Sequence, residues 1–123
     1  MILVDTSVWI DHIGQSEPIL VELLLHDRVR IHPYVIGEIS LGSLRIRPAV
    51  LRALNDLPRV PVATPDEVLF LIEQQQLFSR GIGYVDASLL ASVKLRPGVT
   101  IWTRDKQFKK IADELALSAG LER

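Results

Sequence analysis

The chain opens with the segment Ile2-Leu3-Val4-Asp5-Thr6-Ser7, in which three consecutive apolar residues are followed by an acid. An uninterrupted apolar run is typical of a strand that is buried on both faces, as the strands of a parallel sheet are. Three similar short runs follow, and the last of them comes directly after a Pro-Gly turn. We therefore predict strands at Ile2–Val4, Val29–Ile31, Val60–Ala63 and Val99–Trp102, with a possible fifth around Leu115–Ser118.

Amphipathic segments fill the intervals between these runs. A helix is expected to start near Ser7, and further helices are predicted at Pro18–His26, Tyr34–Leu44, Pro48–Leu57, Asp66–Ser79, Asp86–Lys94 and Lys106–Leu115. Prolines stand where a first helical turn tolerates them. Strands that alternate with helices indicate an α/β fold with a mainly parallel central sheet. The 123 residues fit one domain, residues 1–123, without an internal repeat or a linker.

Composition excludes several classes of protein. The chain has no cysteine, so neither a disulfide framework nor a thiolate zinc site is possible. No basic, apolar leader precedes Asp5, and no apolar run approaches the length of a membrane span, so we expect a soluble, cytoplasmic protein. The net charge is −1, but setting four clustered acids aside leaves +3 on the remainder. A mildly basic surface around an acidic, metal-filled site suits a phosphodiester substrate.

Acidic residues follow the predicted strands at the positions where ligands bind in such sheets. Asp5 comes directly after the first strand and Asp105 just after the last, so both are expected at the carboxyl edge of the sheet. Asp86 opens an apolar helix after a glycine-containing stretch. Glu38 lies in the helix that follows the second strand, among apolar residues. The sequence therefore predicts one cluster of four carboxylates.

Each aspartate also has a purely structural explanation. Asp5 and Asp105 can cap the helices that follow them, and Asp86 can be a favourable charge in a first helical turn. Glu38 can face solvent on an amphipathic helix, although its apolar neighbours make that explanation weaker. The functional hypothesis rests on the four acids taken together.

A cluster of carboxylates is stable when a cation neutralises it, and oxygen ligands suit Mg²⁺ or Mn²⁺. Such an ion activates water and stabilises charge on a phosphate. We predict Asp5 and Asp86 as direct metal ligands, with Asp105 holding a second ion or a water. Glu38 would bind the metal through water or orient the nucleophile. Hydroxyls that support these ligands are predicted at Ser7, Thr103 and Thr6, although Thr6 could instead satisfy backbone groups at the turn.

The motifs resemble those of the PIN-domain ribonucleases, and among them the VapC toxins of toxin–antitoxin pairs. The resemblance spans essentially the whole chain and rests on four segments in order: Ile2-Leu3-Val4-Asp5-Thr6-Ser7-Val8-Trp9-Ile10, Ile36-Gly37-Glu38-Ile39, Asp86-Ala87-Ser88-Leu89-Leu90-Ala91 and Thr103-Arg104-Asp105-Lys106-Gln107-Phe108. It implies a three-layer α/β/α sandwich, and endonucleolytic cleavage of RNA with Mg²⁺ or Mn²⁺ at the four acids. It also implies a VapB-like antitoxin that covers the active site, and a homodimer.

Two basic groups are candidates for contacts with RNA phosphates. Arg104, Lys106 and Lys109, with Lys110, surround Asp105, although part of this group could be only the solvated face of the last helix. Arg45, Arg47 and Arg52 form a second group, in a region that lies near the dimer or antitoxin surface in the family. Both interpretations of the second group stay open.

Other functions are possible for a strand followed by an acid. A haloacid dehalogenase-like phosphatase needs a second aspartate two residues after the first, where this chain has Ser7. A receiver domain needs paired acids after the first strand, but Asp5 stands alone. A PIN nuclease of RNA processing that is not a toxin, and a PIN-fold module that binds RNA or protein without cutting, remain as alternatives.

Overall fold

A parallel sheet lies at the centre of the computed structural model, which describes residues 1–122. Its strands are β1 (Ile2–Val4), β2 (Val29–Arg30) and β3 (Thr100–Trp102), in the order β2-β1-β3. Ile2 is paired with Val29 on one side and with Thr100 on the other. β1 is the central strand, and its three apolar side chains are all buried, as the opening run predicts.

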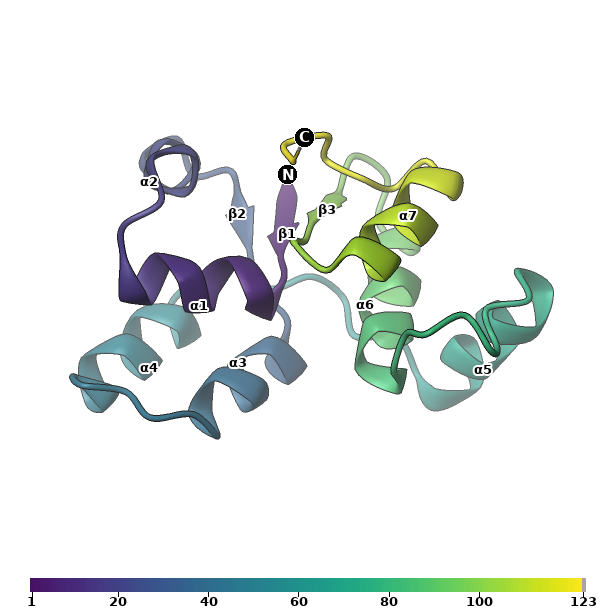
Figure 1. Ribbon diagram of the computed structural model, residues 1–123, viewed down its shortest axis with the longest axis horizontal. Helices are drawn as coiled ribbons and strands as arrows, with labels where there is room; N and C mark the ends of the chain where they lie inside the picture. Colours follow the sequence, from purple (N-terminus) through teal and green to yellow (C-terminus); the bar gives the residue numbers. More distant parts are fainter. Residues whose placement is uncertain (123) are drawn as a thin grey trace.

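Helices flank the strands on both sides. Figure 1 shows α1–α4 to the left of the strands and α5–α7 to the right, which is the predicted three-layer α/β/α arrangement. The helices of the first group are α1 (Thr6–Gly14), α2 (Pro18–Leu25), α3 (Pro33–Ser40) and α4 (Arg47–Asn55). Those of the second are α5 (Pro65–Gln74), α6 (Tyr84–Lys94) and α7 (Lys106–Glu114). No helix in residues 1–122 is both long enough and apolar enough to cross a membrane.

The core joins the sheet to α6, the most deeply buried helix. Seven consecutive residues of α6, from Ala87 to Val93, are buried. They pack in one cluster with the strand residues and with Trp9, Trp102 and Phe108. Since Asp86 directly precedes this buried run, its place in the molecule is fixed by the packing of the whole helix.

The predicted strand Val60–Ala63 is wrong. Pro61 lies in its middle and has no N–H to donate to a ladder, so only an isolated parallel bridge forms here, between Ile31 and Arg59. The possible fifth strand is likewise reduced to one bridge, between Ile101 and Ser118.

The helices occur where the sequence predicts them, with ends that differ by one or two residues, except that two end four or more residues earlier than expected. α3 ends at Ser40 rather than Leu44, before the turn at Gly42. α5 ends at Gln74 rather than Ser79, because Gln76 adopts a left-handed φ of 52° that a helix cannot continue through.

A buried histidine links β2 to the helix on the other side of the sheet. His32 is fully buried, and its Nδ1 accepts a hydrogen bond of 3.0 Å from the backbone N–H of Tyr34. The proton is therefore on Nε2, which donates to Oγ of Ser92 on α6 at 3.2 Å. The same Oγ accepts from the N–H of Ala63 at 3.1 Å. Burial, and the nearby charge of Arg59, lower the pKa of His32 to about 4, so the ring is neutral at neutral pH.

We expect Ser92→Ala to destabilise the protein by about 1–3 kcal/mol, because two buried donors would lose their acceptor. The free energy of unfolding in urea measures this loss. Ser40→Ala is the matched control, since Ser40 donates only to a carbonyl of its own helix and should cost less than about 0.5 kcal/mol. Equal stability of the two variants would contradict this role of Ser92.

Candidate active site

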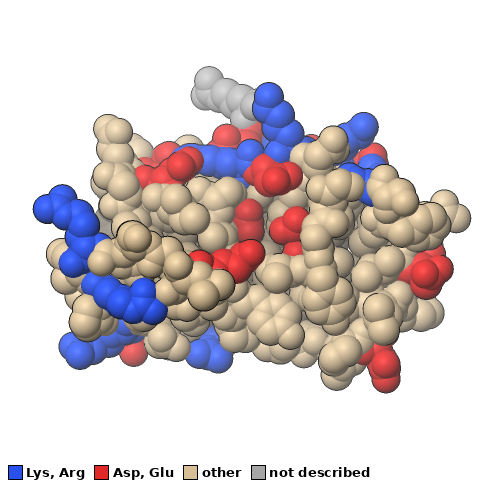
Figure 2. All heavy atoms as spheres, turned by 60° about the horizontal axis from the view of Figure 1, so that its bottom comes forward, with Lys and Arg blue, Asp and Glu red and all other residues tan. Residues whose placement is uncertain are grey.

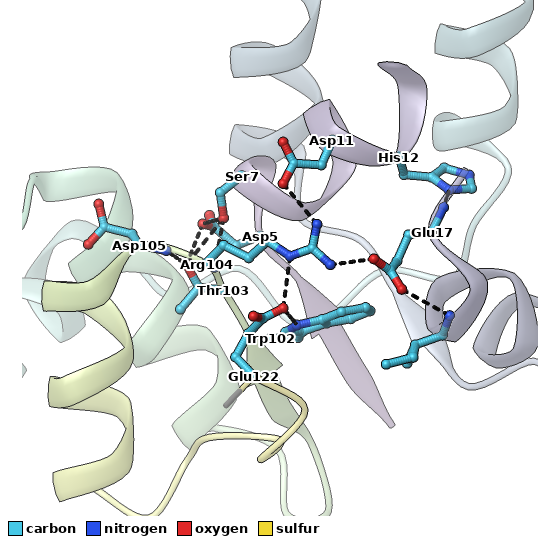
Figure 3. Close-up of polar contacts among 11 residues, drawn as sticks. Asp5, Ser7, Asp11, His12, Glu17, Trp102, Thr103, Arg104, Asp105 and Glu122 are labelled. Carbon is cyan, nitrogen blue, oxygen red and sulfur yellow. Dashed lines mark hydrogen bonds and ion pairs between the residues drawn. The ribbon is translucent and has the colours of Figure 1, made fainter. Parts of the chain in front are cut away.

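The carboxylate of Asp5 lies at the end of β1, held by hydroxyl groups from two segments that are far apart in the sequence. Thr103 Oγ1 donates to Asp5 Oδ2 at 2.7 Å, and Ser7 Oγ donates to the same oxygen at 2.9 Å (Figure 3). Asp5 is only 6% exposed, and its side chain makes no capping hydrogen bond to α1. The capping alternative therefore does not explain this residue.

The segment after β3 is tied to the same position. The backbone N–H of Arg104 donates to Ser7 Oγ at 3.0 Å, and that of Asp105 donates to Thr103 Oγ1 at 3.1 Å. Asp105 Oδ1 accepts from the N–H of Phe108 at 2.9 Å and so caps α7. The expected capping role of Asp105 is therefore real, but no residue among 1–122 donates a hydrogen bond to its Oδ2.

Glu38 comes from α3 and contacts the start of the neighbouring helix α1. The side chain is exposed, and its Oε1 accepts a hydrogen bond of 2.7 Å from Thr6 Oγ1 at the start of α1. Thr6 thus holds a candidate site residue, rather than a backbone group of the turn. The three hydroxyls predicted from the sequence all contact predicted acids; their part in chemistry stays a prediction.

The charges of the other three acids all act on the carboxyl group of Asp86. Its Oδ2 accepts a 3.2 Å hydrogen bond from the N–H of Gly83, which closes the first turn of α6. Burial first, and then the charges of Asp5, Asp105 and Glu38, raise the pKa of its carboxyl to about 6, against the lowering effect of the Gly83 hydrogen bond. Figure 2 shows carboxylates in the middle of this face, between walls of uncharged side chains.

The donor chemistry fits a hard divalent cation, since every candidate ligand is a carboxylate oxygen. The carboxylates are not drawn together as ligands: within residues 1–122, no three acidic or histidine side chains lie close enough to hold one ion. Acids that repel one another without a cation are expected to stand apart in this way. A metal site built from these residues therefore requires small movements of their side chains.

Arg104 has partners that the sequence did not suggest. Its guanidinium pairs with Asp11 and Glu122 at 2.8 Å and with Glu17 at 2.5 Å, and lies 5.5 Å from the centre of the Trp102 ring (Figure 3). These carboxylates come from α1, from the N-cap of α2 and from the C-terminal segment, so no local sequence pattern could have identified them. The predicted contact of Arg104 with RNA stays a prediction, and its side chain already forms ion pairs with these three acids.

An apolar groove of about 1030 Å³ lies between α1, α3 and α4 and adjoins Glu38. Trp9, Ile13, Ile39 and Leu54 contribute to its lining, and Glu38 and Arg45 lie on its wall. The groove thus runs from the candidate site towards the loop that connects α3 with α4.

Comparison with known proteins identifies the family. The family model described as "PIN domain" matches residues 2–114. The chain belongs to the PIN domain family. This PIN domain is also 48% identical over 122 residues to proteins named "Ribonuclease VapC32" from two strains of Mycobacterium tuberculosis, CDC 1551 / Oshkosh and ATCC 25618 / H37Rv. Each match covers 99% of this chain and 98% of the relative.

The predicted resemblance to VapC-type PIN domains and the predicted fold are therefore confirmed. No comparison tests the individual site residues. Their assignment continues to rest on the geometry of the PIN domain, in which segments from both ends of the chain meet at Asp5.

The raised pKa of Asp86 predicts how the stability of this PIN domain changes with pH. The folded pKa of about 6 exceeds the ordinary value of 3.8, so the folded protein retains a proton that the unfolded chain releases in this interval. Stability from this group is present below about pH 4 and is lost as pH rises through about 6. We therefore expect Asp86→Asn to stabilise the protein above pH 6 and to have little effect near pH 4.

Urea unfolding in EDTA between pH 4 and pH 8 measures this difference. Asp56→Asn is the control, because Asp56 is exposed at the end of α4 and is not one of the four candidate site acids. A difference between wild type and Asp86→Asn that is constant across this pH range would refute the interpretation.

Proposed function

We propose that this PIN domain is a metal-dependent endoribonuclease that hydrolyses RNA phosphodiester bonds and acts as the toxin of a toxin–antitoxin pair. The observation that carries the proposal is 48% identity, across almost the full length of both chains, to proteins named as VapC ribonucleases. The interaction of Asp5, Glu38 and Asp105 with Asp86 at the carboxyl edge of the sheet supports it independently.

Asp5 and Asp86 would hold the cation directly, with Asp105 and Glu38 completing the set. When bound, Mg²⁺ or Mn²⁺ would activate water and stabilise charge on the attacked phosphate and the leaving oxygen. The chain itself orients the ligands. Ser7 and Thr103 fix the carboxylate of Asp5 through one oxygen, and Thr6 fixes that of Glu38 in the same way. Prior orientation of this kind reduces the reorganisation needed when ligand and substrate bind.

The first test is cleavage of a set of structured RNAs in Mg²⁺, Mn²⁺ or EDTA. We expect cleavage only with metal. Asp5→Asn and Asp86→Asn should each lower kcat by on the order of 100-fold or more, since a bound ion supplies several kcal/mol of transition-state stabilisation. Asp56→Asn should cleave like wild type. Equal cleavage by all four proteins would overturn the active-site assignment.

Growth of cells that express the protein separates a toxin from other PIN nucleases. Expression should slow growth, Asp5→Asn should abolish the effect, and co-expression of the cognate VapB-like antitoxin should reverse it. The apolar groove that adjoins Glu38 supports such a partner, because a bound segment there would bury apolar surface beside the acids. RNA cleavage without an effect on growth would favour a processing nuclease. Absence of cleavage, with RNA binding kept, would favour a non-catalytic module.

We also propose that the protein forms a homodimer through α5 and the end of α6. Leu69 and Phe70 on α5 are 54% and 65% exposed, and Phe70 shares a surface depression with Leu95. The same depression is lined by acids at the start of α5 and by Lys94. A two-fold contact needs a face that complements itself, and an apolar centre with both signs of charge meets that need.

Sedimentation tests this face. Phe70→Asp should be a monomer at concentrations where wild type is a dimer, because a charge would be buried against apolar surface. Leu25→Asp, at an apolar position on α2 that is even more exposed, should leave the dimer intact. A wild-type monomer, or a Phe70→Asp dimer of unchanged affinity, would contradict this proposal.

A further inference from the structure

The loop after α3 and the helix α4 carry three arginines that form no ion pair within the described residues. Residues 39–55 include Arg45, Arg47 and Arg52 and no acidic residue, and acids flank this range at Glu38 and Asp56. All three arginines are exposed. Among residues 1–122, each ion pair involves other residues than these three. This group, which we name the α4 arginines, is therefore available to a negatively charged partner.

The basic residues around α7 are in a different position. Lys109 pairs with Asp113 on the same helix at 2.9 Å. Arg80, which lies against α7, makes two hydrogen bonds of 2.8 and 2.9 Å to Glu114. Arg104 has its three carboxylate partners. Arg104, Arg80 and Lys109 are thus paired with carboxylates of the protein itself, whereas Lys106 and Lys110 are exposed and, like the α4 arginines, take part in none of the ion pairs of the described residues.

One of the α4 arginines, Arg45, lines the groove that adjoins the candidate active site. Arg45 and Glu38 line the same groove, and Arg47 and Arg52 belong to the helix that forms its far wall. Figure 2 shows the carboxylates in the middle of the face and basic side chains gathered at its left end, the end where Figure 1 has α4. A chain of phosphates that crosses the acids would pass from a negative region onto a positive one.

From this placement we propose that the α4 arginines bind the backbone phosphates of the RNA strand on one side of the scissile bond. The inference rests on the proposed ribonuclease function and adds the surface that holds the substrate. Guanidinium groups keep their charge at all relevant pH values and form paired hydrogen bonds with phosphate oxygens. A polyanion that approaches four carboxylates needs such an attraction nearby.

An acidic protein segment is the rival partner for the same arginines. Such a segment would run alongside Glu38 and the three aspartates, where its own carboxylates are repelled. RNA differs because the phosphate at the acids meets the proposed cation, while the phosphates that follow meet arginine. The geometry therefore favours RNA.

The test compares two double variants of equal charge. R45Q/R52Q removes two of the α4 arginines. R28Q/R96Q removes two exposed arginines from the opposite edge of the sheet, where β2 and β3 begin. Binding of a fluorescent single-stranded RNA is measured by anisotropy between 50 and 200 mM salt in the Asp86→Asn background, which is expected not to cut. Cleavage is measured with each pair in the otherwise unchanged protein.

We expect R45Q/R52Q to weaken RNA binding by about tenfold or more at low salt and to reduce the salt slope by about 1.4, because each lost phosphate contact contributes about 0.7 for a single strand. KM should rise and kcat should stay within about twofold. R28Q/R96Q should match the parent protein in both assays, and adding Arg47→Gln to the first pair should weaken binding further.

Equal RNA binding by R45Q/R52Q and the parent would overturn the inference, as would an equal loss in R28Q/R96Q, which would indicate only a general effect of charge. Loss of antitoxin binding with RNA binding retained would assign the arginines to the protein partner instead. A failure of the proposed ribonuclease function would look different from a failure of this inference. In that case wild type would not cut RNA, even if these variants differed in RNA binding. Absence of any RNA binding by the parent would overturn both.

Discussion

Repulsion among carboxylates at the end of β1 is the constraint that the surrounding structure has to withstand. Asp5 is buried, and its charge, together with those of Glu38 and Asp105, raises the pKa of Asp86. Hydroxyl groups from both ends of the chain meet at a single oxygen of Asp5. Parallel pairing of β1 with β3 is what brings them there, because it sets Thr103 beside Asp5 across the sheet. Gathering negative charge in one place lowers the folding stability, and such arrangements are common at functional sites.

Much of this arrangement could be predicted from the sequence, because it follows from short-range patterns. The run Ile2–Val4 has no polar alternation and therefore indicates a strand buried on both faces, and the acid after it is placed by the general geometry of parallel sheets. The strand predicted at Val60–Ala63 is wrong because the missing N–H of Pro61 prevents a ladder, although the segment is apolar. The early end of α5 depends on the left-handed conformation of Gln76, a residue type that gives no signal for it.

The contacts of Arg104 show what sequence patterns cannot supply. A basic residue beside a candidate site acid suggests a phosphate contact, and only the fold reveals that Asp11, Glu17 and Glu122 converge on Arg104. Asp105 illustrates a second limit, since its capping and functional explanations were treated as alternatives. Oδ1 of Asp105 accepts the capping hydrogen bond, and no residue among 1–122 donates a hydrogen bond to Oδ2. The two explanations are therefore compatible.

The end of the chain has a consequence for handling the protein. Glu122 accepts hydrogen bonds from the indole of Trp102 and from Arg104, and residues 117–119 pair with Ile101 in the central sheet. Residues 117–122 thus pack along β3, the strand at this edge of the sheet. A purification tag or a fused fluorescent protein is therefore better attached through a long, uncharged spacer than by replacing residues 117–122. A trimmed C-terminus would leave an indole N–H and part of a guanidinium unpaired one residue away from the site.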